Sequence, residues 1–135
     1  MKMYAVLRND IWMDAGKAAA QAGHAFAHVT MLSQIEYPER LQTYLPEGYR
    51  IAGTKVALGA TYKEIQKLRS ECSELNLPQW TMFDNGHVFL PHFDGKHDVL
   101  TAMGIGPLFM EEAEKLLGDL KLFTVNEGLK KKRKI

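Results

Sequence analysis

The sequence contains a single cysteine, Cys72, and no apolar run long enough to cross a bilayer. One cysteine excludes an internal disulfide, which is typical of proteins from a reducing compartment. A membrane-spanning helix needs about 20 consecutive apolar residues, so we expect no contact with a membrane. The opening segment reaches Arg8 before a signal-peptide core forms, so we expect no secretion signal. The sequence therefore predicts a soluble, cytoplasmic protein.

The sequence also lacks a strong excess of charge of either sign. It has 17 basic and 16 acidic residues, a net charge of +1, which excludes a uniformly basic nucleic-acid-binding protein. Residues 130–134 are all basic, however, and they follow a predicted break at residues 126–128. Such a run is usually a solvated tail. The alternative is that it adds a salt-dependent attraction to RNA phosphates.

The 135 residues, 46% of them apolar, suffice for one compact domain built of alternating strands and helices. Predicted strands cover residues 3–7, 55–58, 80–83, 88–90 and 100–105, with a loop at 91–98 and a break at Gly106-Pro107. Predicted helices cover residues 15–35, a short piece within 36–50, the segment between Thr61 and Pro78, and 110–117. This order predicts an α/β fold: a three-layer α/β/α sandwich with a mixed sheet of about four strands and helices on both faces.

Local signals mark the helix boundaries. Asp14 occupies the N-cap position of the first long helix. Thr61 and Glu64 form a capping box at the start of the third helical segment. Cys72 falls on the apolar face of that segment, so inert burial is favoured over a role as nucleophile.

A stripe of polar residues runs along the first long helix. Lys17, Gln21, His24 and His28 are offset by 0, 4, 7 and 11 positions, which places them on one side of a helix beside its apolar face. Gly16 leaves room there for another molecule, and free N–H groups of the first turn favour a phosphate. The alternative is a half-buried boundary whose polar groups bond only to neighbouring backbone.

Two aspartates follow predicted strands. Asp84 ends the strand at 80–83, and Asp10 follows the first strand. Ligands of open α/β sheets gather beyond the carboxyl ends of the strands. A carboxylate near Lys17 is suited to hold or deprotonate a water molecule. The alternative is that each aspartate only stabilises its own turn.

Other chemistries have weaker support. The sequence has no Gly-x-Ser-x-Gly elbow, no Walker loop and no Gly-x-Gly-x-x-Gly motif. Residues 104–107 only superficially resemble a phosphate loop. A solvated loop is favoured over a metal site for the five possible ligands between residues 87 and 98, so no metal is predicted. Those five are His87, His92, Asp94, His97 and Asp98.

One longer motif is more specific. Residues 16–25 read Gly-Lys-x-Ala-Ala-Gln-x-x-His-Ala, and this string closely resembles type II peptidyl-tRNA hydrolases. The resemblance extends over about residues 2–123. Further matching positions include Lys2-Met3, Arg8-Asn9-Asp10, Gly53, Lys55-Val56, Asp84, Gly86, Thr101, residues 104–107 and Leu120-Lys121-Leu122.

The resemblance implies a hydrolase that cleaves the ester bond of peptidyl-tRNA and releases free tRNA. Some family members also act on D-aminoacyl-tRNA. It further implies a homodimer that needs no metal or other cofactor, with tRNA as its partner. The chain then divides into a hydrolase-like domain at 1–123 and a basic C-terminal tail at 124–135.

The resemblance also implies roles for single residues. Lys17 would stabilise the developing oxyanion or hold a tRNA phosphate. Asp84 would orient the attacking water, Thr101 would bond to the substrate or to that water, and His24 would relay a proton. Lys55 and the tail would contact phosphates without reading sequence. The predicted substrate-binding residues are Gly16, Gln21, Lys55, Gly86, His87, Gly104 and Gly106.

The chain departs from the family pattern beside this site. Where the family has Ala-Gly-Arg-Thr after the aspartate, this chain has Asn85-Gly86-His87-Val88, so a threonine hydroxyl is lost. The loop from Asp84 to Thr101 is longer than usual, and Asp14 replaces a glycine. These departures leave two alternatives open: a diverged protein that binds RNA or a small nucleotide without cleaving it, and a hydrolase of another nucleotide-linked ester.

Overall fold

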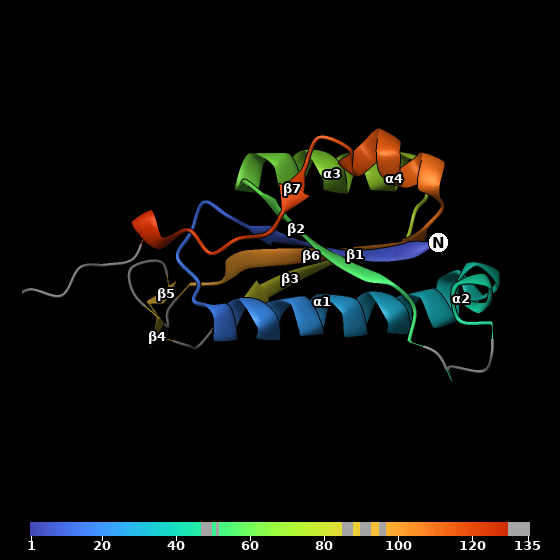
Figure 1. Cartoon of the computed structure of the whole chain (residues 1–135), viewed down its shortest axis with the longest axis horizontal. Coiled ribbons are helices and arrows are strands. Elements are labelled where there is room, and N and C mark those ends of the chain that lie inside the picture. The colour runs from blue at the N-terminus through green and yellow to red at the C-terminus, as the bar shows by residue number, and fades with distance from the viewer. Residues whose placement is uncertain (47–49, 51, 85–87, 90–92, 95–96, 130–135) are drawn as a thin grey trace, which may run out of the picture.

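The computed structural model describes residues 1–46, 50, 52–84, 88–89, 93–94 and 97–129. Their order of strands and helices follows the predicted alternation (Figure 1). The helices are α1 Ala15–Glu36, α2 Pro38–Tyr44, α3 Tyr62–Glu74 and α4 Met110–Leu117, with a final 3-10 turn at Glu127–Leu129. The strands are β1 Lys2–Arg8, β2 Lys55–Ala60, β3 Gln79–Asp84, β4 Val88–Phe89, β5 Phe93–Asp94, β6 Val99–Leu108 and β7 Lys121–Leu122.

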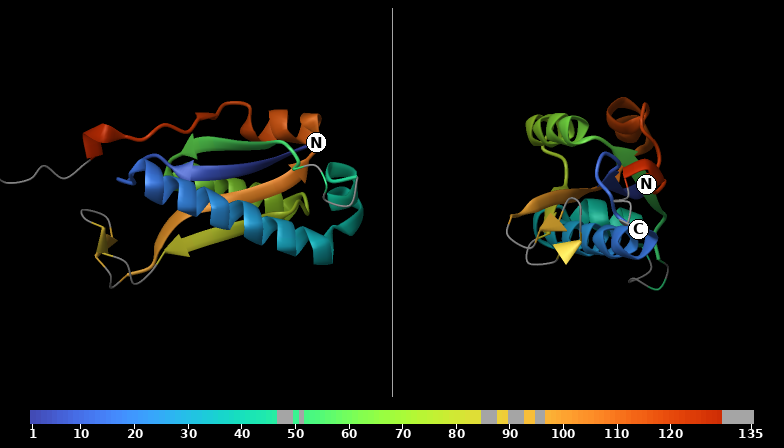
Figure 2. Two further views of the ribbon diagram at one scale, coloured as in Figure 1. Left: turned by 60° about the horizontal axis from the view of Figure 1, so that its bottom comes forward. Right: turned by 90° about the vertical axis from the view of Figure 1, so that its left-hand side faces the viewer.

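The fold has three layers. Helices α1 and α2 cover one face of the central sheet, and α3 and α4 cover the other (Figures 1 and 2). The strand order is β3-β6-β1-β2-β7. Strand β1 pairs with β2 in parallel, while the other neighbours pair antiparallel. The predicted mixed sheet with helices on both faces is therefore confirmed.

The sheet has five strands instead of about four. The additional strand β7 pairs with the outer edge of β2, where Leu58 faces Leu122 and Gly59 faces Lys121. Two residues are too few to produce an alternating pattern in the sequence. The predicted loop at 91–98 also contains strand β5, which forms a separate two-stranded sheet with β4.

The prediction that Gly106-Pro107 ends the last long strand is wrong. Strand β6 continues to Leu108, which still pairs with Lys2 of β1. The Gly106-Pro107 peptide bond is cis, and Gly106 has a φ of 115°. Because glycine adopts positive φ without a steric penalty, the backbone turns here and still stays in the sheet.

The apolar side of α1 packs against the sheet. The Asp14 side chain caps the helix by accepting a hydrogen bond from the Lys17 backbone N–H at 2.8 Å, as predicted. Ala25 and Val29 are fully buried against β6. Gly104 of β6 permits this close packing, since an added Cβ would lie 2.4 Å from the Ala25 carbonyl oxygen. The position of α1 over the sheet therefore depends on small residues in both elements.

Helix α3 also begins as predicted. The Thr61 hydroxyl and the Glu64 carboxylate each accept a backbone N–H of the other residue, which completes the capping box. Cys72 lies on the buried face, and burial raises the pKa of its thiol to about 12. The predicted burial of Cys72 is therefore confirmed, and a thiol that stays protonated at neutral pH is a poor nucleophile. Among the described residues, no helix is long and apolar enough to span a membrane.

Candidate active site

Two charged side chains meet where the first turn of α1 passes the end of β3. The Lys17 Nζ atom lies 2.6 Å from Oδ2 of Asp84. The Lys17 side chain is 13% exposed and that of Asp84 is 9% exposed. The low exposure strengthens the attraction, because little water screens the two charges. The structure thus brings together the two residues to which the resemblance assigned the main chemistry.

The alternation of β3 places Asp84 on the side of the sheet that faces α1. Residues 80, 82 and 84 share one face of a strand because side chains alternate with a period of two. Met82 packs against the apolar cluster beneath α1. At the other end of β3, the ring of Trp80 stacks on His28 of α1, with ring centroids 5.0 Å apart. Asp84 therefore meets the first turn of α1, where Lys17 lies.

A hollow of about 360 Å³ opens between α1 and the outer strand β3. We call it the α1–β3 hollow. Its α1 wall is mostly polar, and its β3 wall combines two apolar residues with Asp84. The lining residues are Lys17, Ala20, Gln21, His24, Met82, Phe83 and Asp84. Charged, amide and imidazole groups thus border one space that is open to solvent.

A hydrogen bond from the buried residue Thr101 holds the Gln21 side chain in place. The Thr101 hydroxyl donates a hydrogen bond of 2.6 Å to Oε1 of Gln21, and both residues are buried. In the pairing of β3 with β6, Met82 faces Ala102 and Phe83 faces Leu100, so Thr101 has no partner on β3 and forms a β-bulge. A bulge changes the direction of a side chain, and bulges are common next to active sites. Thr101 contacts a residue of the hollow and is not itself among its lining residues.

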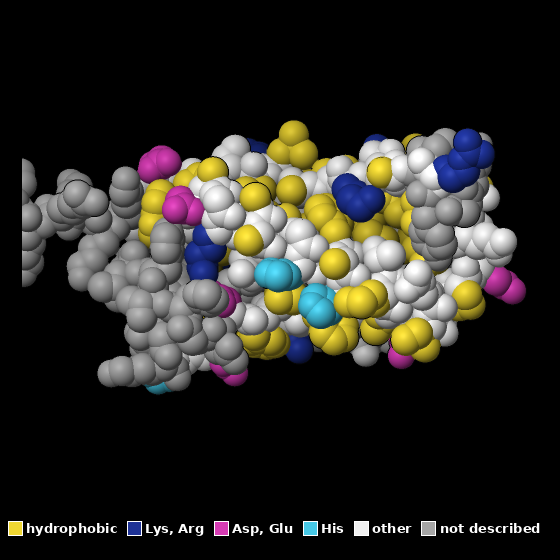
Figure 3. Space-filling model, turned by 90° about the horizontal axis from the view of Figure 1, so that it is seen from below, with side chains coloured by type: hydrophobic (Ala, Val, Ile, Leu, Met, Phe, Trp, Pro, Cys, Tyr) yellow, Lys and Arg dark blue, Asp and Glu magenta, His cyan; other side chains and the backbone are white. Residues whose placement is uncertain are grey.

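Two of the four stripe residues lie closer to the surface. His24 is exposed and lines the α1–β3 hollow, and His28 is half-buried beside Trp80. The face formed by α1 carries neighbouring histidine side chains among apolar ones (Figure 3). The predicted stripe therefore borders the apolar face, as its spacing indicated.

Asp10, the other aspartate at a strand end, is engaged elsewhere. Its carboxylate accepts hydrogen bonds from Arg8 at 2.9 and 3.2 Å and from the Tyr62 backbone N–H at 3.1 Å. Burial alone would raise the pKa of Asp10, but these hydrogen bonds and the charge of Arg8 lower it. Asp10 therefore joins the end of β1 to the start of α3.

Several predicted substrate-binding residues lie away from the α1–β3 hollow. Lys55 begins β2 opposite Met3, at the other end of the sheet, and its Nζ donates to the Gly53 carbonyl. Gly104 is buried under α1, and Gly106 accepts a hydrogen bond from Ser33 near the far end of β6. Gly16 is exposed beside Lys17, close to the site.

Part of the prediction lies outside the described residues. This applies to Gly86, His87, His92 and the basic run at 130–134. Within the part of the chain that the structure describes, no group of three His, Cys, Asp or Glu residues could hold a metal ion.

The contribution of β3 side chains other than Asp84 to the site was not predicted from the sequence. Met82 and Phe83 line the hollow, and Trp80, farther along β3, stacks on His28 of α1. The sequence does contain a signal for this contribution, because a strand that ends in Asp84 also directs residues 80 and 82 to the same face. The sequence does not indicate that this face packs against α1, since that contact depends on the three-dimensional packing.

The arrangement suits hydrolysis of an ester. A lysine ammonium can stabilise the negative charge that develops on a carbonyl oxygen. A carboxylate beside it can orient a water molecule and accept its proton. The open hollow gives a substrate access to both groups.

Comparison with known proteins gives a consistent result. The family model described as peptidyl-tRNA hydrolase PTH2 matches residues 1–123. A peptidyl-tRNA hydrolase of Methanocaldococcus jannaschii is 34% identical over 122 residues, which cover 90% of this chain and 99% of that protein. One of Sulfurisphaera tokodaii is 34% identical over 125 residues, covering 90% and 97%. One of Pyrobaculum aerophilum is 31% identical over 126 residues, covering 91% and 98%.

Proposed function

The chain belongs to the peptidyl-tRNA hydrolase PTH2 family, and we propose that it hydrolyses the ester bond of peptidyl-tRNA to release free tRNA. The family resemblance inferred from the motif at residues 16–25 is confirmed. The observation that carries the proposal is the Lys17–Asp84 ion pair, 2.6 Å long, at the border of an open hollow. Nothing in the comparisons favours a protein that binds RNA without cleaving it.

Lys17 and Asp84 have complementary roles in this reaction. The water oxygen forms a bond to the ester carbonyl carbon, and the ribose oxygen leaves. Asp84 orients the water and accepts its proton, and Lys17 stabilises the oxyanion that develops on the carbonyl oxygen. Because the two groups contact each other before substrate arrives, little reorganisation is needed when charge develops.

Gln21, Thr101 and His24 complete the proposed site. Thr101 acts through its hydrogen bond to Gln21, so we assign it a positioning role. Gln21 presents its amide to the α1–β3 hollow, where it can bond to substrate or water. His24 lines the same hollow and is exposed, which suits a proton relay to the leaving oxygen.

Further parts of the proposal concern the molecule as a whole. We assign the hydrolase activity to residues 1–123 and treat 124–135 as an accessory tail, in keeping with the extent of the family match. We also propose a homodimer in the cytoplasm. The one buried cysteine, Cys72, suits a reducing compartment.

The test is release of peptide from N-acetylaminoacyl-tRNA. Lys17→Ala and Asp84→Asn should each reduce kcat/KM by about 100-fold or more, the range measured when one charge-stabilising or proton-transfer group is removed. Lys115→Ala, which removes an exposed lysine of α4, is the matched control and should keep full activity. Wild-type turnover at the enzyme-free rate would refute the hydrolase, and full activity in both site variants would refute this site. The same assay with D-aminoacyl-tRNA tests whether the protein also hydrolyses that ester.

A further inference from the structure

Trp80 lies at the edge of the sheet, between the proposed active site and a second hollow. It is 38% exposed, although tryptophan is usually well covered. His28 of α1 stacks on it with ring centroids 5.0 Å apart and an interplanar angle of 11°. Within the described part of the chain, β3 is an outer strand of the central sheet, and Trp80 lies at that edge. The two rings therefore form an aromatic surface that solvent can reach.

The second hollow, of about 530 Å³, lies between α3 and β3, and we call it the α3–β3 hollow. Among the described residues that line it, Trp80 is the only aromatic one. The others carry hydroxyl, amide or guanidinium groups. They are Gln66, Arg69, Ser70, Ser73, Gln79 and Thr81. Arg69 supplies a permanent positive charge, and its Nη1 donates to Oε1 of Gln66 at 2.9 Å.

The two hollows lie on opposite faces of the sheet and share β3 as a border, and Trp80 contacts both sides because it stacks on His28 of α1 and lines the α3–β3 hollow. Trp80 and Asp84 are four positions apart, a distance of about 13 Å at roughly 3.3 Å per residue of strand. Consecutive nucleotides of a stacked strand are about 3.4 Å apart, so this distance corresponds to about four stacked nucleotides and to fewer in an extended strand. A base that contacts Trp80 would thus belong to the last few nucleotides before the ester.

We propose that Trp80, stacked on His28, together with the α3–β3 hollow binds the unpaired 3′ end of the tRNA. A base stacks on the exposed aromatic surface, and the polar side chains of the hollow bind its edge and the adjoining phosphate. Aromatic stacking is the usual means by which proteins hold unpaired bases, and Arg69 supplies the charge that a phosphate requires. This inference rests on the proposed function, because it takes the ester to lie at the Lys17–Asp84 pair.

The composition of the hollow favours a nucleotide over the peptide part of the substrate. Six of the seven described residues that line it are polar, and one of these, Arg69, carries a permanent positive charge. A nucleotide presents an aromatic face, hydrogen-bonding edges and an anionic phosphate together, and the site offers a partner for each. A peptide of variable sequence would gain little from Arg69 and the two serines.

The first test measures binding directly through Trp80 fluorescence. The trinucleotide CCA, which has the sequence of a tRNA 3′ end, is titrated into the full-length protein. Stacking on Trp80 should quench its emission, whereas Trp12, which is 7% exposed, reports the background. The quench should disappear in Trp80→Phe, although that variant retains a stacking ring. An unchanged fluorescence in the wild-type protein at millimolar trinucleotide would overturn the proposal.

The second test separates binding from chemistry. Trp80→Ala should raise KM for N-acetylaminoacyl-tRNA about 5- to 100-fold, the range found for loss of one base–aromatic stack, and change kcat little. Trp80→Phe should restore most of the lost binding. Arg69→Ala should raise KM and reduce the dependence of KM on salt. Leu122→Ala, an exposed apolar residue on the opposite edge of the sheet, is the control and should match wild type.

The outcomes distinguish failure of the proposed 3′-end site from failure of the proposed hydrolase function. A wild-type KM in Trp80→Ala, with hydrolysis intact, would overturn the 3′-end site and leave the hydrolase standing. A KM effect that depends on the acyl group and not on the tRNA would assign the hollow to the peptide and overturn the proposal. A change in sedimentation of Trp80→Ala without a change in trinucleotide binding would assign the surface to a second copy of the chain, and that also overturns it.

Discussion

Lys17 and Asp84 are 67 positions apart in the sequence, yet Lys17 Nζ and Asp84 Oδ2 lie only 2.6 Å apart. The contact joins the first turn of α1 to the last residue of the outer strand β3. Each charge is largely shielded from water, and the pair borders the α1–β3 hollow. The same contact therefore holds α1 to the sheet and, in the proposed mechanism, takes part in the reaction.

Removal of one member of this pair should destabilise the fold. In Lys17→Met the Asp84 carboxylate keeps its low exposure and loses its cation, and we expect a loss of about 2–3 kcal/mol in the free energy of unfolding. The double variant Lys17→Met/Asp84→Asn should recover part of this loss, because no uncompensated charge remains. Urea unfolding at pH 7 measures both values. Additive effects of the two substitutions would contradict the coupling.

Thr101→Val should impair catalysis through Gln21. The substitution preserves shape, but it leaves Oε1 of Gln21 without the 2.6 Å hydrogen bond, at a cost of about 1–2 kcal/mol in stability. Because Gln21 lines the hollow, we expect kcat to fall about tenfold at unchanged tRNA affinity.

Two variants control for this effect. Thr101→Ser retains the hydroxyl and should recover most of the activity. Thr43→Val removes an exposed hydroxyl of α2 that donates to the Glu39 carbonyl, and it should leave kcat unchanged. A wild-type kcat in Thr101→Val would refute the positioning role of Thr101.

Gly104→Ala should displace α1 from the sheet. The added Cβ would lie 2.4 Å from the Ala25 carbonyl oxygen and 3.0 Å from the Val29 side chain, so we expect a loss of about 1–3 kcal/mol in stability. Gly23→Ala on α1 is the matched control. An added Cβ at Gly23 has no atom within 4 Å, and the substitution should stabilise the helix by about 0.5–1 kcal/mol. Thermal unfolding of both variants tests the contrast.

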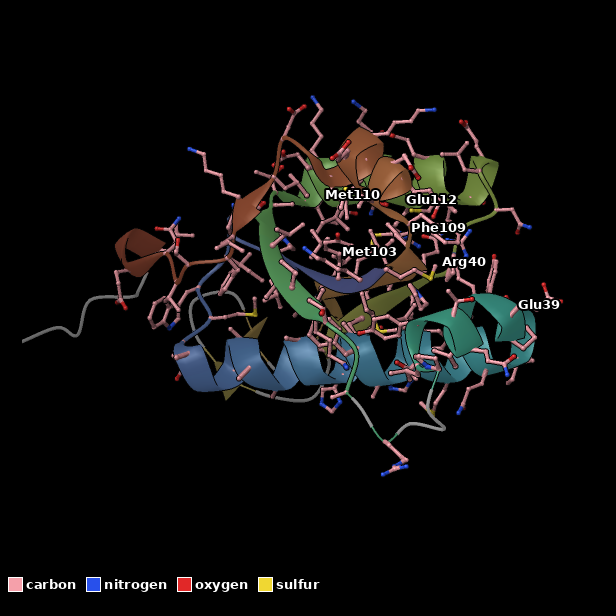
Figure 4. All side chains as sticks on the ribbon, turned by 45° about the vertical axis from the view of Figure 1, so that its right-hand side comes forward. Glu39, Arg40, Met103, Phe109, Met110 and Glu112 are labelled. Atoms are coloured by element: carbon pink, nitrogen blue, oxygen red, sulfur yellow. The ribbon has the colours of Figure 1, made fainter. Side chains whose placement is uncertain are left out.

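The Arg40–Glu112 ion pair should make stability sensitive to acid. It links α2 to α4 at the end of the molecule shown in Figure 4, with Arg40 also over the ring of Phe109. The hydrogen bond from Arg40 holds the pKa of the Glu112 carboxyl below its ordinary value of 4.5. Because folding favours the ionised form, the stabilisation is complete above pH 4.5 and is lost as the pH falls through the lowered pKa.

Glu112→Gln tests this dependence. The variant should be less stable than wild type at pH 7 by about 1 kcal/mol, and the difference should shrink as the pH is lowered below 4.5. Glu39→Gln, an exposed position of α2, should follow the wild-type profile. Urea unfolding at pH 7 and at pH 3 gives both differences. A difference that is equal at the two pH values would contradict the linkage.

Local patterns in the sequence were sufficient to predict most helices and strands. The Asp14 cap and the Thr61–Glu64 capping box each involve residues only three positions apart, so the sequence contains the whole interaction. The burial of Cys72 follows from helical periodicity in the same way. The motif at 16–25 identified the family because its residues are specific, independently of any packing argument.

Contacts between distant segments could not be predicted in this way. Strand β7 has two residues and exists because the edge of β2 offers unpaired backbone groups nearby. Strand β6 passes through Gly106-Pro107 because β1 continues beside it to Lys2. In both cases the deciding partner lies far along the chain, so the local pattern indicated a loop or a break.

By itself the sequence determined the family and the layered α/β class, and it singled out the charged residues of the proposed site, since these depend on residue identity and on short periodicities. The tertiary structure alone decided that Lys17 meets Asp84, that Thr101 holds Gln21 from inside, and that Trp80 stacks on His28. Each of these contacts depends on how β3 and β6 are paired and how α1 lies across them. That arrangement results from burial of apolar surface throughout the molecule, and no short segment encodes it.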